Sequence, residues 1–223
     1  MRYDMTVYKL ENPLDEAEPM DTALIDLICS TRAMRRLKPD PVPPELIRQI
    51  LRAATAAPPA SNRYGWRFLV IRNQAIKDAV ADRYRRIWSQ EDGAAAFRKG
   101  APSRIRYHQM LDAVDYQADH LHEAPVWIVP CLIGPRTWDA GSGIYPAVQN
   151  ILLAARALGL GATLTTMVQH DAEADALLGL PDEAHSYALL PIGYPLGKFG
   201  PVAPVALEEV VFADRWGEKW SGS

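Results

Sequence analysis

The sequence predicts an α+β fold in which helices cover a central β-sheet. Segments with helical spacing and short apolar runs typical of strands alternate along the 223 residues, and about four of these runs resemble core strands. Two helical segments separate the first strand from the second, which departs from a simple βαβ alternation. Hydrophobic residues make up 48% of the chain and charged residues 23%, as in ordinary globular proteins, so a sizeable core is expected.

Six segments have the apolar spacing of helices, and four runs are expected as strands. The expected helices lie at 21–28, 43–54, 76–88, 103–122, 144–158 and 171–179. The expected strands lie at 66–71, 125–133, 163–168 and 187–192. Pro44 suits the first turn of the second helix, and Gly159 is expected to end the fifth. Residues 1–20 are interrupted by Pro13 and Pro19 and rich in acidic side chains, which predicts a solvated N-terminal arm.

Charge and hydropathy exclude several classes of partner. Lys and Arg number 24 against 27 for Asp and Glu, and a formal charge of −3 argues against a nucleic-acid-binding polycation. No apolar run approaches the ~18 residues that span a bilayer, and the acidic start is unlike a signal peptide. Two cysteines far apart match neither a disulfide framework nor a metal cluster, so a reducing, cytoplasmic location is expected. No membrane, metal or nucleic-acid partner is therefore predicted.

The most informative local feature is a basic turn that places four cations within residues 32–38. Most such runs are solvated connections between helices. The alternative is an anion site, because guanidinium groups bind phosphate in a bidentate manner and stay charged at any working pH. No phosphate-binding loop is present, and the glycines at 159 and 161 follow a helix, unlike a dinucleotide fingerprint.

Two other candidates have mainly structural interpretations. Asn62, in the loop 58–65, could offer a donor and an acceptor to a planar heterocycle, although asparagine often only turns the chain. Cys29 lies on the apolar side of its helix, which favours a core position over catalysis. Residue chemistry alone thus predicts an α+β domain with a basic site for a small anion.

Four stretches, in order and at compatible distances, resemble the nitroreductase family of FMN-dependent oxidoreductases. They run from Thr31 to Leu37, from Ala57 to Phe68, from Gln149 to Gly161, and from Ile192 to Pro195 with 207–216 behind it. The resemblance covers residues 21–217 as an FMN-binding domain and leaves 218–223 as a C-terminal tail. It implies a mixed β-sheet flanked by helices in an intertwined homodimer, with FMN at the subunit interface and the apolar face of helix 144–158 in the dimer core.

The resemblance also implies which residues bind the cofactor. Arg32 would bind the FMN phosphate, and Arg35 would lie beside the N1–C2 carbonyl edge, where a cation favours the reduced flavin. The loop 59–62 would cover the flavin from the partner chain. The implied cofactor-binding residues are Arg32, Ala33, Met34, Arg35, Pro59, Ala60, Ser61, Asn62, Thr165, Thr166 and Lys198.

The sequence departs from the family pattern at the phosphate side. Ala33 stands where the family often has serine, and Tyr64-Gly65 replaces Gln-Pro. Many members carry a C-terminal Arg or Lys before the last strand, whereas residues 201–205 read Pro-Val-Ala-Pro-Val. Lys198 is the expected substitute for that cation.

These features predict an FMN-dependent oxidoreductase that takes a hydride from NADH or NADPH through flavin N5. The acceptor would be planar, such as a nitroaromatic or a quinone, and no catalytic side chain is expected because the chemistry lies on the flavin. Segment 89–122 is the candidate lid and specificity element. The alternatives are a flavin-dependent dehydrogenase, a reductive dehalogenase or a flavin-destroying enzyme on the same fold, or a flavin-binding protein without turnover.

Overall fold

The computed structural model describes residues 23–59, 65–90, 94, 98, 105–135, 140–200 and 206–220. Its α-helices are α1 (Ala23–Ser30), α2 (Pro44–Thr55), α3 (Gln74–Ser89), α5 (Ile105–His120), α6 (Tyr145–Ala157), α7 (Ala172–Leu177) and α8 (Leu207–Val210). Short 3-10 helices span Leu121–Glu123 and Ala140–Gly143. The strands are β1 (Trp66–Ile71), β2 (Val126–Ile133), β3 (Gly161–Ala162), β4 (Ala184–Ser186) and β5 (Leu190–Gly193).

The strands form a five-stranded sheet in the order β1-β2-β5-β3, with β4 also paired to β2. The α+β class is as predicted. Every pairing between the described strands is antiparallel, whereas the resemblance implied a mixed sheet. The long strand β2 lies at the centre, because β1 pairs along one of its edges while β4 and β5 share the other.

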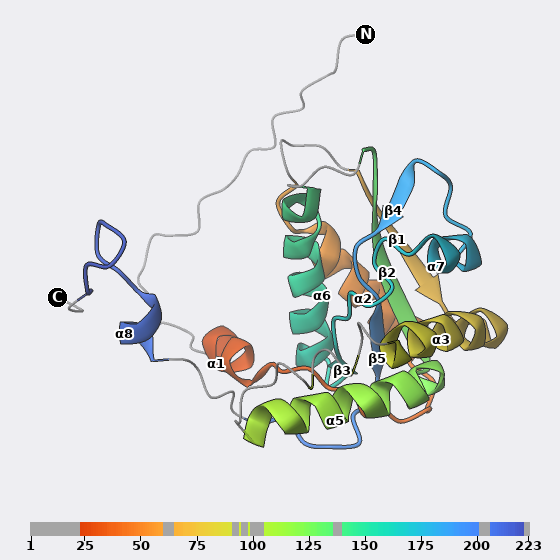
Figure 1. Ribbon diagram of the computed structural model, residues 1–223, viewed down its shortest axis with the longest axis horizontal. Coiled ribbons are helices and arrows are strands. Elements are labelled where there is room, and N and C mark those ends of the chain that lie inside the picture. The colour runs from red at the N-terminus through yellow and green to blue at the C-terminus, as the bar shows by residue number, and fades with distance from the viewer. Residues whose placement is uncertain are drawn as a thin grey trace, which may run out of the picture.

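The two faces of β2 contact two different hydrophobic clusters, as the two-residue period of a strand requires. Val126 and Ile128 belong to a cluster with residues of α2 and α6. Trp127 and Val129 belong to a second cluster with residues of α3 and α5. Figure 1 shows the same division, with α6 and α2 beside one face of the sheet and α3 and α5 toward the other. The sheet is therefore buried on both sides.

The expected strand at 187–192 is only partly present, because β5 begins at Leu190 and a separate strand, β4, precedes it at Ala184–Ser186. The division lies opposite Pro130 of β2, which has no backbone N–H and cannot continue the ladder as a donor. The Pro130 carbonyl still accepts a hydrogen bond from Tyr187 N at 3.0 Å. Interrupted pairing at a proline thus separates β4 from β5 and delays the start of β5 to Leu190.

The expected strand at 163–168 is also wrong. The residues that pair with a neighbouring strand are Gly161 and Ala162 of β3, which precede the expected range. Within that range, Thr165 forms an isolated bridge with Leu189. Thr165 Oγ1 then accepts from Met167 N at 3.4 Å, and Gln169 N donates to Thr166 O at 2.9 Å. These local hydrogen bonds turn the chain away from the sheet.

Several apolar side chains of the subunit lie on its surface. In α1 no residue is buried, and Leu24, Ile25 and Ile28 are 62%, 56% and 43% exposed. Cys29 of the same helix is exposed too, so its expected core position is wrong. The helix is apolar, but it lies against α6 along only part of its surface.

The inner face of α6 is already used within the subunit. Ile151 is fully buried among residues of the subunit's own core, as are Val148 and Ala155. The prediction that this face serves a dimer core is therefore wrong for these residues. In contrast, α8 lies apart from the sheet and the other helices (Figure 1), and Leu207 and Val210 on it are more than half exposed.

Candidate functional site

The basic turn is held in place by hydrogen bonds of its backbone. Met34 N donates to Ala162 O of β3 at 2.9 Å, and Lys38 N donates to Tyr194 O after β5 at 2.7 Å. Met34 and Leu37 are buried beneath the turn. The turn therefore lies along the end of the sheet as a short, firmly attached segment.

Close approach of the turn to β3 depends on Gly161. A Cβ atom at this position would lie 2.9 Å from both Leu37 Cδ2 and Met34 Cβ, and 3.2 Å from Pro195 Cβ. Separations below 3.0 Å are not tolerated without a shift of the neighbours. The absence of a side chain at Gly161 thus lets the basic turn pack directly on the sheet.

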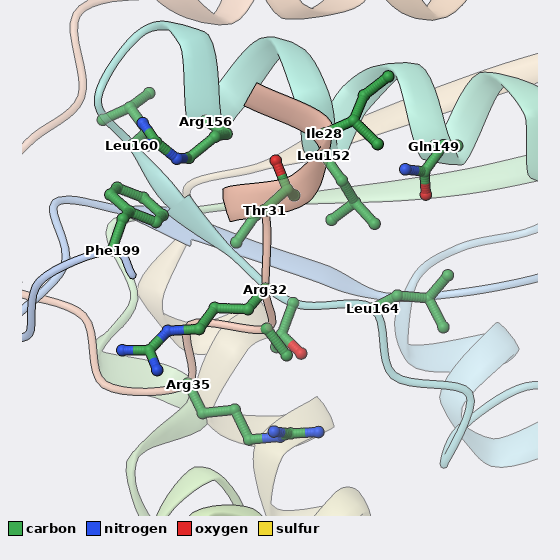
Figure 2. A pocket seen from close by; sticks show the side chains of 13 residues that line it. Ile28, Thr31, Arg32, Arg35, Gln149, Leu152, Arg156, Leu160, Leu164 and Phe199 are labelled. Atoms are coloured by element: carbon green, nitrogen blue, oxygen red, sulfur yellow. The ribbon is translucent and has the colours of Figure 1, made fainter. Parts of the chain in front are cut away.

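Above the turn, between α1 and α6, lies a cavity of about 240 Å³ that we call the cationic cavity. Figure 2 shows Arg32 and Arg35 leaving the same turn in different directions, while Arg156 enters from α6. The lining residues are Ile28, Thr31, Arg32, Ala33, Arg35, Gln149, Leu152, Arg156, Leu160, Ala162, Thr163, Leu164 and Phe199.

The cationic cavity carries three guanidinium groups, and none of its described lining residues is a carboxylate. None of the ion pairs among the described residues involves Arg32, Arg35 or Arg156. Burial lowers the pKa of Arg35, while the nearby Tyr84 acts weakly in the opposite direction. Partly buried cations without anionic partners are costly, so the cavity favours an anionic ligand.

Two buried polar atoms in the cavity wall also lack a hydrogen-bond partner among the described residues. They are Arg156 Nε and Thr163 Oγ1. Buried polar groups in native proteins are nearly always satisfied by protein, water or ligand. A ligand with several hydrogen-bond acceptors, such as a phosphate ester, would suit a cavity whose three guanidinium groups have no carboxylate partner among the described residues.

A second cavity of about 380 Å³, the apolar cavity, adjoins the first, since Arg35 and Leu164 line both. Its other lining residues are Tyr84, Trp88, Met110, Leu111, Val114, Gln117, Thr165, Thr166 and Met167. Tyr84 Oη and Thr165 Oγ1 are 3.2 Å apart, and burial raises the pKa of Tyr84. The site thus has a cationic end and an apolar, aromatic end that meet at Arg35, and this suits a ligand with a phosphate at one end and a flat ring system at the other.

Comparison with known proteins agrees with this geometry. The sequence pattern of the Nitroreductase family matches residues 28–194, which include the basic turn, the sheet and α6.

The chain belongs to the nitroreductase family.

Among its relatives is a protein named NADH dehydrogenase from Thermus thermophilus, 31% identical over 195 residues, which are 81% of this chain and 90% of that one. An iodotyrosine deiodinase from Thermotoga neapolitana is 26% identical over 172 residues, covering 77% of this chain and 88% of the relative. A crystal structure of oxidized iodotyrosine deiodinase bound to FMN and 3-iodo-L-tyrosine has a TM-score of 0.68 at 26% identity, covering 86% of this chain and 98% of that one.

The residues that the nitroreductase resemblance implied are distributed over both cavities. Arg32, Ala33 and Arg35 line the cationic cavity, and Thr165 and Thr166 line the apolar cavity. Met34 lies beneath the turn and is among the residues described for neither lining.

The remaining implied residues lie elsewhere. The side chain of Lys198 is exposed, while its backbone O accepts a hydrogen bond from Arg32 Nη2 at 2.7 Å. Pro59 is not among the described lining residues of either cavity. Ala60, Ser61 and Asn62 lie outside the described residues. Of the candidate lid at 89–122, α5 and the following 3-10 helix are described, and α5 provides one wall of the apolar cavity.

Among the lining residues of the cationic cavity that sequence reasoning missed, Arg156 and Thr163 are the two with an unsatisfied buried polar atom. Arg156 is the one charged residue within the described α6, Tyr145–Ala157, and that isolation was a usable signal. A cation in the last turn of a helix is ordinarily explained by the helix dipole, which conceals a binding role. Thr163 was assigned to an expected strand and offered no signal of its own. In the described parts of the chain, no helix is long and apolar enough to span a membrane, and no group of three or more metal-ligating side chains comes together.

Proposed function

We propose that this nitroreductase-family protein is an FMN-dependent oxidoreductase that uses NADH or NADPH to reduce a planar acceptor such as a nitroaromatic or a quinone. The observation that carries the proposal is the pair of adjoining cavities, one lined by three arginines without a carboxylate and the other by aromatic and thioether side chains. When bound, FMN would supply hydride transfer between the nicotinamide and the acceptor. The family's FMN-containing structure supports this choice of ligand.

The chain's own residues would position the flavin and adjust its electrostatics. Arg32 lies at the cationic end and would bind the phosphate. Arg35, where the cavities meet, would place its charge beside the ring system. Thr165 and Thr166 would supply polar contacts within an otherwise apolar wall. Side chains of α5 would exclude water and shape the space for the acceptor.

We further propose that the functional unit is a homodimer in which each flavin contacts both chains. The exposed apolar side chains of α1 and the separate position of α8 support it, since such surfaces are normally covered. Ile28 of α1 also lines the cationic cavity, so a partner packed on α1 would lie at its rim.

The first test is the visible absorption spectrum of the purified protein, followed by the mass of the released flavin. We expect flavin bands and FMN. Steady-state oxidation of NADH and NADPH should then accelerate when a nitroaromatic or a quinone is added. Absence of flavin, together with failure of the protein to bind added FMN, would contradict the proposal.

A second candidate is reductive dehalogenation, because several of the relatives are named iodotyrosine deiodinase. The same preparation supplied with 3-iodo-L-tyrosine and a chemical reductant separates the two functions. Release of iodide at a rate above that of nitroaromatic or quinone reduction would favour the dehalogenase.

The position of Arg35 predicts a change in redox potential. We expect Arg35→Ala to lower the flavin's midpoint potential by roughly 30–60 mV and Arg35→Lys to lower it less, because a charge-assisted contact contributes about 1.5–3 kcal/mol. Redox titration of the flavin-loaded variants measures this. The control is Arg36→Ala, since Arg36 lies in the same turn but stacks on Tyr116 at 4.5 Å and is not among the described lining residues of either cavity. An unchanged potential in Arg35→Ala at normal FMN occupancy would remove Arg35 from this role.

A further inference from the structure

The cationic end of the site is built around two guanidinium groups that come from distant parts of the chain. Arg32 Nη2 donates to the backbone O of Lys198 at 2.7 Å. The Arg156 guanidinium lies over the ring of Phe199, 4.1 Å from its centroid. Both groups therefore converge on consecutive residues, and both line the cationic cavity.

The Arg156 side chain is fixed in orientation, but one of its N–H donors has no hydrogen-bond partner among the described residues. Its Nη2 donates to Ser30 Oγ of α1 at 3.1 Å, and the Phe199 ring holds the plane of the guanidinium. Its Nε is buried and has no partner among the described residues. A fixed cation with an unused donor is preorganised for a ligand oxygen, because little side-chain entropy remains to be lost on binding.

The resemblance implies a further cation near the C-terminus of the chain, and the sequence has none at that place. Residues 201–205 carry no positive charge, and the exposed Lys198 contributes its backbone to the described contacts. A phosphate monoester carries up to two negative charges at neutral pH, which a pair of arginines can match. Arg156 is the one cation outside the basic turn that lines the cationic cavity among the described residues.

We propose that Arg156 and Arg32 together form the phosphate clamp of this protein, with Arg156 in the place of the missing C-terminal cation. The inference rests on the proposed function, since the phosphate is that of FMN. It assigns α6 a binding role in addition to its role in the core. It also explains the isolated charge in that helix and the unsatisfied Nε.

The test compares FMN with riboflavin, which lacks the phosphate, by titrating flavin-free protein and following flavin fluorescence. We expect Arg156→Gln to weaken FMN binding roughly 10- to 100-fold, as loss of a charge-assisted contact implies, and to change riboflavin binding by less than about threefold. Arg156→Lys should recover part of the lost FMN affinity, because lysine keeps the positive charge but lacks the bidentate hydrogen-bonding geometry of the guanidinium group.

The control separates ligand binding from support of α1. Ser30→Ala removes the hydrogen-bond partner of Arg156 in the protein but keeps the cation, and it should leave FMN binding within about threefold of the parent. Unchanged FMN affinity in Arg156→Gln would overturn the clamp. Equal losses for FMN and riboflavin, or a loss in Ser30→Ala as large as in Arg156→Gln, would overturn it too.

The same titrations distinguish failure of the proposed function from failure of the phosphate clamp alone. If the unmodified protein binds neither flavin, both the function and the clamp are wrong. If it prefers FMN to riboflavin and Arg156→Gln keeps that preference, the function stands and only the clamp is wrong.

Discussion

Substituting Gly161 with alanine should loosen the flavin site and the fold together. The added Cβ would lie 2.9 Å from Met34 Cβ, which is close to the backbone and cannot rotate away. Overpacking of this kind costs about 1–3 kcal/mol, so the basic turn should move off β3. We expect FMN affinity to fall roughly 10- to 100-fold and the melting temperature to fall by about 2–10 °C. Flavin titration and thermal unfolding of the flavin-free protein measure the two effects.

Gly200→Ala is the matched control for this variant. No atom of the described residues lies within 4 Å of a Cβ built at Gly200, so the alanine meets no crowding comparable to that at Gly161. Both variants lower the entropy of the unfolded chain by the same amount, and the difference between them isolates the crowding at Gly161. If the two variants behave alike in both measurements, the close approach at Gly161 does not position the turn.

Dimerisation and FMN binding should be linked, and a charge on α1 should weaken both. Ile25 is 56% exposed in the subunit, so Ile25→Asp should leave the subunit folded. A two-fold interface would contain the substitution twice. Loss of two buried isoleucines raises the dimer dissociation constant by roughly 100- to 10,000-fold. Because a ligand that binds only the dimer stabilises it by mass action, flavin should dissociate along with the subunits.

Analytical ultracentrifugation at the flavin absorbance, over a dilution series with and without added FMN, measures this linkage. Leu177→Asp is the control, because Leu177 is a partly exposed apolar residue on α7, away from α1 in Figure 1. It should remain a flavin-loaded dimer. A monomer of the parent or of Ile25→Asp that sediments with full flavin occupancy would refute a flavin site shared between chains.

The parts of the fold that follow from local chemistry could be predicted from the sequence. The start of α2 is a proline at the first helical position, and the end of α6 is a glycine with φ of 76°. The N-terminal cap of α7 is Asp171, whose side chain accepts from Ala174 N at 2.8 Å. Each of these signals depends on a few neighbouring residues, so no knowledge of the tertiary structure was needed.

The errors arose where a distant residue decides the local structure. The division between β4 and β5 depends on Pro130, more than fifty residues earlier in the chain. The assignment of Ile151 to a dimer face required knowing that the subunit's own sheet already covers it. An apolar helical stripe predicts burial, but it does not say which surface provides the cover.

The binding site likewise contains residues that the sequence reveals and residues that only the tertiary structure brings together. The cations of the basic turn are adjacent in sequence and were recognised together. Arg156 joins them only because α6 brings the end of its last turn beside α1 and Phe199. Arg156 is separated from Arg32 by more than a hundred residues, and because the helix dipole already explains a lone helix-terminal arginine, its isolation alone does not identify such a neighbour.

The separate C-terminal segment also divides the tryptophans of the described residues between two optical environments. Trp66, Trp88 and Trp127 are at most 8% exposed in the body of the protein, whereas Trp216 and Trp220, beyond α8, are 92% and 46% exposed. Indole emission shifts to longer wavelength in water, so these two groups of tryptophans emit at different wavelengths while α8 and its neighbours remain uncovered. Any surface that comes to cover this segment moves the emission of the second group toward that of the first. The exposed tryptophans Trp216 and Trp220 thus provide a spectroscopic reporter of any contact that covers this segment.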